Sequence, residues 1–262
     1  MKNIKVRTKL TIIVALVLVL VASESFISIQ NMNQLKNKAL DTMDTSSRQN
    51  YDDSIKEQVG VVISLLSEIN NEYKSGKYTL DEAKKIAADE IRQMRYGNGG
   101  YFWVDQSDGK NIVLLGSSTE GTNRMNTKDA DGYQMVKEII RVAVQDGGGY
   151  TDYVFPKEGE TEPSPKRSYS EYFKPFDWVV GTGNYTDYID TAIAQQDEEF
   201  TSYASSKAIS LILCSVCMLI VVAILVALIA IDITKSLRKI KEQFEVIAGG
   251  NFATKMQQPM LK

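Results

Sequence analysis

Histidine is absent from the 262 residues of this chain, and cysteine occurs only twice, as Cys214 and Cys217. Without histidine, the chain has no imidazole base, no His metal ligand and no phospho-His residue of its own. Two cysteines are too few for a disulfide framework or a Cys-rich zinc site. The sequence also lacks a nucleophile elbow and a phosphate-binding loop. We therefore expect no catalytic residues, no metal and no cofactor.

Two long apolar runs divide the chain, at residues 10–29 and 208–231, and the second has no charged side chain. At about 1.5 Å per residue, the second run extends about 36 Å as a helix, enough to cross a hydrocarbon core of roughly 30 Å. We expect both runs to be transmembrane helices. For the first run a cleaved secretory signal is the alternative, because a basic start and a short apolar stretch describe that as well.

Charge is distributed unevenly along the chain. The net charge is +4 in residues 1–9, +3 in residues 232–262 and therefore −10 in the segment between them. The positive-inside rule places residues 1–9 and 232–262 in the cytoplasm and residues 30–207 outside it. The acidic outer segment also argues against a nucleic-acid partner.

The outer segment, residues 30–207, alternates between helical and strand patterns. Apolar positions recur at helical spacing through residues 31–75, Thr79 to Glu82 match a capping box, and a second helix is expected to about Arg95. After Asp187 an amphipathic helix leads into the second span. Strand patterns lie between, with one helix after the second of them, at residues 101–105, 111–115, 150–155, 166–173 and 178–185. Because the other strand connections are short, we expect an antiparallel sheet and an α+β fold.

The outer segment also carries a series of short motifs. They are Tyr96-Gly97-x-x-Gly100-Tyr101-Phe102-Trp103-Val104, Asp108-Gly109, Glu120-Gly121, Asp129-x-x-Gly132, Gly149-Tyr150-x-x-Tyr153-x-Phe155-Pro156-Lys157, Pro165-Lys166-x-Ser168-Tyr169 and Trp178-Val179-Val180-Gly181-Thr182-Gly183-x-Tyr185-x-Asp187. In order and spacing they resemble the single-Cache type 2 sensor family of bacterial chemoreceptors. The resemblance implies a PAS-like, five-stranded antiparallel sheet with a long N-terminal helix, between two transmembrane helices, and a small-ligand pocket on one face of the sheet.

The last segment, residues 232–262, resembles the start of a HAMP module. Ala248 to Phe252 match the turn that ends the first helix of that family. Apolar residues spaced 4, 3, 4 and 3 apart form a heptad seam, at Ile233, Leu237, Ile240, Phe244 and Ile247. We expect only a partial HAMP module here, with the downstream signalling domain absent from this chain. A charged juxtamembrane amphipathic helix is the alternative.

Small carboxylates are a common ligand class of the Cache family, as the resemblance implies. Binding one away from water needs a cation and hydroxyl donors. The candidate ligand-binding residues are Tyr101, Trp103, Tyr153, Lys166 and Arg95. Each has a plainer alternative: the three aromatic residues could belong to the core, Lys166 could be solvated, and Arg95 could pair with an acid at the helix end.

Strand alternation constrains this set, because successive side chains point to opposite faces of a sheet. Tyr101 and Trp103 share one face. Lys166 and Ser168 also share a face, and Tyr169 points the other way. We therefore prefer Lys166 to Tyr169 as a ligand contact.

Together these features predict the sensory half of a methyl-accepting chemotaxis protein. It would be a multi-pass protein of the bacterial inner membrane that binds a small extracellular ligand, expected to be a small organic acid, and relays the signal through the second span to HAMP. The heptad seam implies a dimer or a higher assembly, and we expect a homodimer. The nearest alternative is the input half of a sensor histidine kinase or cyclase. A membrane-anchored extracytoplasmic enzyme and a structural or adhesion domain are the remaining alternatives, and we expect no enzymatic activity.

Overall fold

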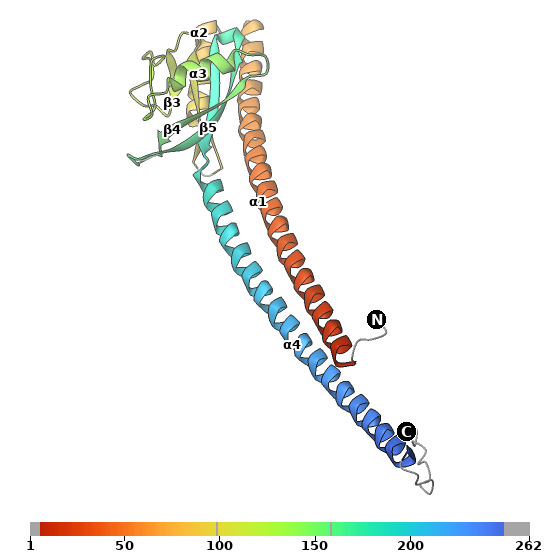
Figure 1. The fold of residues 1–262 in the computed structure, drawn as a ribbon. Helices are drawn as coiled ribbons and strands as arrows, with labels where there is room; N and C mark the ends of the chain where they lie inside the picture. The colour runs from red at the N-terminus through yellow and green to blue at the C-terminus, as the bar shows by residue number, and fades with distance from the viewer. Residues whose placement is uncertain (1–5, 98, 158, 249–262) are drawn as a thin grey trace. The chain divides into compact units, whose positions relative to one another are not determined.

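The computed structural model describes residues 6–97, 99–157 and 159–248. Residues 38–197 form one compact unit, and the remaining parts of the two longest helices form another. Figure 1 shows the elements in chain order, which are α1 (Val6–Lys74), α2 (Leu80–Gln93), β1 (Arg95–Tyr96), β2 (Gly100–Gln106), β3 (Asn111–Leu114), α3 (Met135–Ala143), β4 (Gly149–Pro156), β5 (Pro163–Phe173), the 3₁₀ turn η1 (Lys174–Phe176), β6 (Trp178–Tyr185) and α4 (Asp187–Ala248).

The predicted α+β fold with an antiparallel sheet is confirmed. The strands run in the order β1-β2-β6-β5-β4, and β3 pairs with β2 off this path. Every pairing is antiparallel. The five predicted strands are all present, and β1 adds a sixth of only two residues. The antiparallel order places the last strand, β6, in the middle of the sheet, next to both β2 and β5.

The end of α2 differs slightly from the sequence prediction. The capping box between Thr79 and Glu82 is present, but the helix ends at Gln93, before the expected Arg95. Met94 is already extended, and Tyr96 pairs with Gly100 in the ladder. The Tyr96 ring lies so close to Gly100 that a Cβ there would meet it at 2.6 Å. Pairing with β2 therefore ends the helix about two residues early.

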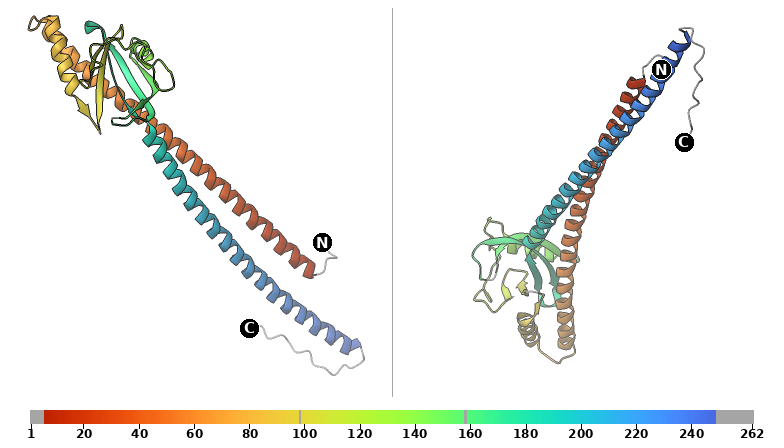
Figure 2. Two further views of the ribbon diagram at one scale, coloured as in Figure 1. Left: turned by 90° about the vertical axis from the view of Figure 1, so that its left-hand side faces the viewer. Right: turned by 90° about the horizontal axis from the view of Figure 1, so that it is seen from below.

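One face of the sheet, the α1 face, packs against α1 and α2. In α1, buried side chains recur at helical spacing from Tyr51 to Ile69. They form a core with Phe102, Val104 and Tyr169 from the sheet. The Asp52 carboxylate anchors the helix through the Arg167 guanidinium, at 2.6 and 2.8 Å. The hairpin of α1 and α2 can be followed in Figure 2.

The opposite face of the sheet, the α3 face, carries a second and smaller core. Met135, Val136, Ile139 and Ile140 from α3 pack here with Trp103, and with Tyr153 and Val179 from the neighbouring strands. Alternation separates the two faces as expected: Phe102 packs against α1, whereas its neighbour Trp103 packs against α3. The α3 face is the one that carries the candidate site.

The second unit consists of residues 6–37 of α1 and residues 198–248 of α4. Both helices are long and apolar enough to cross a membrane. Large side chains such as Leu16 and Leu225 are more than half exposed, which suits contact with lipid. Ser25 Oγ lies 3.2 Å from Ser215 Oγ, a polar contact between the two helices. The turn expected at Gly249 to Phe252 lies outside the described residues.

Candidate functional site

Four of the five predicted site residues come together on the α3 face. Lys166 of β5 pairs with Tyr153 of β4 on one side and with Tyr185 of β6 on the other. Tyr101 and Trp103 reach the same place from β2, on the far side of β6. All four line a small cavity, the Lys166 pocket, together with Leu114, Arg124, Met135, Val136, Ile139 and Phe155. Its volume is about 20 Å³, close to the space that one water molecule needs.

The Lys166 ammonium group is buried without a carboxylate partner. The residue is only 2% exposed, and its Nζ donates a hydrogen bond to the Tyr101 hydroxyl at 3.0 Å. Within the described residues, no Asp or Glu forms an ion pair with it. Burial, together with the nearby Arg124 charge, lowers the pKa of Lys166 to about 8. An uncompensated cation in a nearly dry site is costly, so it is unusual as a purely structural feature.

Four aromatic rings surround this ammonium group and form an aromatic cage. The Nζ atom lies within 6 Å of each ring centroid, close enough for cation–π attraction. The distances are 4.7 Å to Tyr101, 5.1 Å to Tyr185, 5.4 Å to Phe155 and 5.7 Å to the Trp103 ring. The rings offset part of the cost of burying the charge, but they cannot neutralise it.

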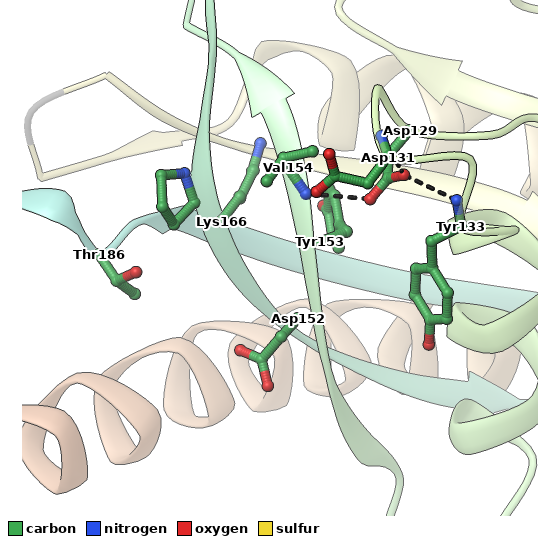
Figure 3. A pocket seen from close by; sticks show the side chains of 9 residues that line it. Asp129, Asp131, Tyr133, Asp152, Tyr153, Val154, Lys166 and Thr186 are labelled. Carbon is green, nitrogen blue, oxygen red and sulfur yellow. Dashed lines mark hydrogen bonds between the residues drawn. The ribbon is translucent and has the colours of Figure 1, made fainter.

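Asp129 and Asp152, two of the acidic side chains near Lys166, already have other hydrogen-bond partners. Lys166 also borders an open pocket of about 370 Å³ that Asp129, Asp131 and Asp152 line (Figure 3). Asp129 accepts hydrogen bonds from the backbone N–H groups of Asp131, Tyr133 and Val154. Asp152 points to the opposite side of β4 from Lys166 in Figure 3, where it pairs with Arg167. Asp129 and Asp152 thus hold a turn and neighbouring strands in place.

Arg124 is a second cation in the pocket, and sequence reasoning missed it. It lies in the irregular loop after β3, and its Nε and Nη2 atoms donate to the Asp105 carboxylate at 2.7 and 2.5 Å. Asp105 is completely buried and also accepts a hydrogen bond from Asn111. The Nη1 group of Arg124 has no hydrogen-bond partner in the described part of the chain. The alternation of side chains along β2 could have predicted this pair, because it places Asp105 on the same face as Tyr101 and Trp103. A carboxylate that points into the core needs a cation as its partner.

Trp103 contributes an unsatisfied donor. Its indole Nε1 is buried and has no hydrogen-bond partner among the described residues. The ring lies over Gly181, where an added Cβ would meet indole atoms at 2.5 Å. A buried N–H group without an acceptor costs about 1–3 kcal/mol, so this donor is suited to a group that arrives from outside the chain.

Comparison with known proteins supports a sensory role. The model of the single Cache domain 2 family matches residues 47–199, which contain the sheet, α2, α3 and the Lys166 pocket. The chain belongs to the single Cache domain 2 family. The resemblance noted in the sequence is thereby confirmed, and the HAMP resemblance stays a prediction.

Relatives of this Cache domain occur in two classes of receptor. The chain is 28% identical over 177 residues to the methyl-accepting chemotaxis protein McpP of Pseudomonas putida, covering 67% of this chain and 30% of McpP. It is 31% identical over 176 residues to the sensor histidine kinase MctS of Rhizobium johnstonii, covering 67% of this chain and 37% of MctS. The chain thus corresponds to about a third of each relative.

One solved structure has a similar fold, and its sequence identity to this chain is close to that of the two relatives. It is described as showing carboxylic acid recognition by a Cache chemosensory domain, with a TM-score of 0.51 and 27% identity. The match covers 54% of this chain and 97% of that one. Membrane receptors with periplasmic sensor domains are therefore the setting in which this Cache fold is found.

Arg95 does not join the other four residues. It is exposed, and its Nη1 donates to the carbonyl oxygens of Arg92 and Met94 at 2.9 and 2.7 Å. A cation at a helix C-terminus satisfies carbonyl groups that lack an intrahelical partner. The structure therefore gives Arg95 a capping contact at the end of α2, and the site proposed below omits it.

A wider groove of the Cache domain reaches Lys166 from the end of the sheet where α4 begins. Its volume is about 890 Å³, and its walls include Tyr51, Tyr96, Tyr101, Lys157 and Tyr185. The Tyr185 hydroxyl donates to the Pro156 carbonyl, which holds the β4–β5 hairpin against β6. Lys166 is among the residues that line this groove.

Proposed function

We propose that this chain is the sensory half of a transmembrane chemoreceptor whose Cache domain binds a small carboxylate at Lys166. The observation that carries the proposal is the buried Lys166 ammonium group without an acidic partner. A ligand carboxylate would supply the missing negative charge, and a charge-assisted hydrogen bond in a dry site is strong. Lys166 and the Nη1 group of Arg124 provide the cations, and the Trp103 Nε1 and the Tyr101 and Tyr153 hydroxyls provide neutral hydrogen-bonding groups.

The small volume of the Lys166 pocket supplies a signalling mechanism. A carboxylic acid of a few carbon atoms needs more than 20 Å³, so α3 or the Arg124 loop moves outward when it binds. The ligand then favours one of two arrangements by its differential affinity for them. The Lys166 ammonium group lies against the ring of Tyr185, two residues before α4 begins. A ligand-induced rearrangement at Lys166 therefore reaches the helix that leads to the second span.

The domain layout is part of the proposal. Residues 1–9 lie in the cytoplasm, 10–29 and 208–231 cross the membrane, 30–207 sense the ligand outside, and 232–262 begin a HAMP module. The relay passes through the second span, and two copies associate along the heptad seam. Chemical crosslinking of the full chain in membranes tests the dimer: a species of one chain's mass at every concentration contradicts it.

A thermal-shift screen tests the ligand proposal directly. The full chain, in detergent micelles, is heated with small organic acids and with amines of matched size. A carboxylate at a hundred times its Kd raises the free energy of unfolding by about 2.7 kcal/mol. Lys166→Ala abolishes this shift, and Lys137→Ala, an exposed lysine on α3, keeps it. If amines raise the melting temperature as much as acids do, the proposal is contradicted.

The input half of a sensor histidine kinase is a second candidate, favoured by the 31% identity to MctS. The sensory chemistry is the same in both cases. The coding sequence after Lys262 separates them, because a kinase needs a phospho-accepting histidine that this chain does not contain.

A further inference from the structure

We propose that Lys166 forms a reversible imine with the carbonyl carbon of a small 2-oxo acid. This inference rests on the proposed function and narrows its ligand class from carboxylates in general to 2-oxo acids. The geometry that points to it is an amine buried among rings, with a proton-transferring hydroxyl beside it and separate donors nearby for a carboxylate.

The surroundings of Lys166 suit a nucleophilic amine. Lysine becomes a nucleophile where it is desolvated or close to another cation, and both conditions hold here. With a pKa of about 8, roughly one in ten molecules has the neutral amine at pH 7, against fewer than about one in a thousand for an ordinary lysine. Because no described acid pairs with Lys166, nothing holds the amine in its charged form except the rings and Tyr101.

The other groups of the Lys166 pocket fit the rest of a 2-oxo acid. Its carboxylate is attached directly to the carbonyl carbon, so both must lie within one small cavity. The Nη1 group of Arg124 and the unsatisfied Nε1 of Trp103 are the donors available for that carboxylate. Lys166 is then left to face the carbonyl carbon.

The reaction needs no oxidant or reductant. The neutral Lys166 nitrogen attacks the carbonyl carbon; a C–N bond forms, the carbonyl π bond breaks, and the oxygen takes a proton to give a carbinolamine. Tyr101, whose hydroxyl lies 3.0 Å from the nitrogen, relays the protons. The carbinolamine hydroxyl then takes up the proton that Lys166 had released on becoming neutral and leaves as water, while the nitrogen lone pair forms the C=N bond. The product is a protonated imine with the charge of the original ammonium group, and the aromatic cage stabilises that cation in the same way.

Reductive trapping tests the inference on the full chain in detergent micelles. The chain is incubated with pyruvate and sodium cyanoborohydride, which reduces an imine to a stable secondary amine, and the modified lysines are located by peptide mass spectrometry. We expect one adduct at Lys166, saturable in pyruvate, forming at least about tenfold faster than at the exposed Lys137, because burial leaves more of the Lys166 amine neutral. Propionate, which has a carboxylate and no ketone, should protect Lys166.

Three outcomes separate this inference from the proposed function. If pyruvate and propionate both raise the melting temperature but Lys166 is labelled no faster than Lys137, the imine is excluded and the carboxylate site stands. If acetaldehyde labels Lys166 as efficiently as pyruvate, the 2-oxo acid class is excluded. If neither acid raises the melting temperature and no selective adduct forms at Lys166, both proposals fail. Because the mapping uses the wild-type chain, the answer does not depend on whether a Lys166 variant folds.

Discussion

Lys157, in the loop after β4, forms an ion pair with Asp187, the first residue of α4. Its ammonium group also lies 5.4 Å from the centre of the Tyr185 ring, and Lys166 lies 5.1 Å from the same centre. Tyr185 is therefore held between the buried lysine of the proposed site and a half-buried lysine that pairs with the first residue of α4. This sequence of contacts connects the Lys166 pocket to the helix that would carry the signal.

Replacing Lys157 with Gln should uncouple the pocket from α4 with little loss of stability. Both partners of the ion pair are about a third exposed, so solvent screens the pair and its loss should change the free energy of unfolding little. We expect ligand-induced protection of amide hydrogens in the first turn of α4 to decrease, as measured by hydrogen exchange. Lys77→Gln, which breaks a comparable exposed pair with Glu72, is the control. Unchanged protection in Lys157→Gln would exclude this route.

Lys166→Met should stabilise the domain and abolish its response to carboxylates. Methionine has a similar length and removes the cost of an unpaired buried charge, so we expect a gain of about 1–3 kcal/mol in chemical denaturation. Lys137→Met should stay within about 0.5 kcal/mol of the wild type. A destabilised Lys166→Met protein would mean that the aromatic cage outweighs the desolvation cost, and that Lys166 is retained for folding.

Carboxylate affinity should fall at alkaline pH. The folded-state pKa of Lys166, about 8, is below the value of about 10.4 expected in the unfolded chain. Above pH 8 the ammonium group loses its proton, and affinity measured by calorimetry should fall about tenfold per pH unit. Burial raises the pKa of Tyr153, so that phenol stays protonated over this range.

The same pKa shift predicts the pH dependence of stability. Between about pH 8 and 10.4 the unfolded chain binds more protons at this position than the folded chain, so the contribution of Lys166 to stability rises with pH. The difference in stability between wild type and Lys166→Met, measured at several pH values, isolates this contribution from other titrating groups. If the stability difference between the two proteins does not change with pH, the lowered pKa of Lys166 is contradicted.

The pair of Arg124 and Asp105 should contribute far more to stability than a similar pair on the surface. Arg124→Met leaves the completely buried Asp105 carboxylate without its cation, which should cost about 3–5 kcal/mol in denaturant unfolding. Arg141 makes a similar two-point contact with Glu138 on the exposed side of α3. Arg141→Met should leave the free energy of unfolding nearly unchanged, because solvent screens this pair. Equal losses in the two variants would show that Asp105 is solvated.

Gly181→Ala and Gly60→Ala should have effects of opposite sign. A Cβ at Gly181 would meet the Trp103 indole at 2.5 Å, whereas nothing lies within 4 Å of a Cβ at Gly60 in α1. We expect Gly60→Ala to gain about 0.5–1 kcal/mol from helix propensity. Gly181→Ala should lose about 1–3 kcal/mol through overpacking and weaken ligand binding, because the ring that carries Nε1 must move. Carboxylate affinity unchanged in Gly181→Ala would remove Trp103 from the site.

Local patterns in the sequence predicted most of the elements and their faces. The capping box at Thr79 needs only contacts three residues apart, and the shared face of Tyr101 and Trp103 needs only a period of two. The preference for Lys166 over Tyr169 followed from the same alternation, and Tyr169 does lie in the core on the α1 face. The two apolar runs were visible from composition and length, although the first also fits a cleaved secretory signal.

The tertiary structure alone decided which of these side chains meet. Tyr101 and Lys166 are 65 residues apart, and their contact requires that β6 lie between β2 and β5 in one particular register. Arg124 reaches Asp105 from a loop without any periodic pattern, and Arg95 turns to the end of α2. The physical reason is range: helix and strand periods determine which way a residue faces within its own element, whereas pairing between distant strands depends on burial summed over the whole sheet.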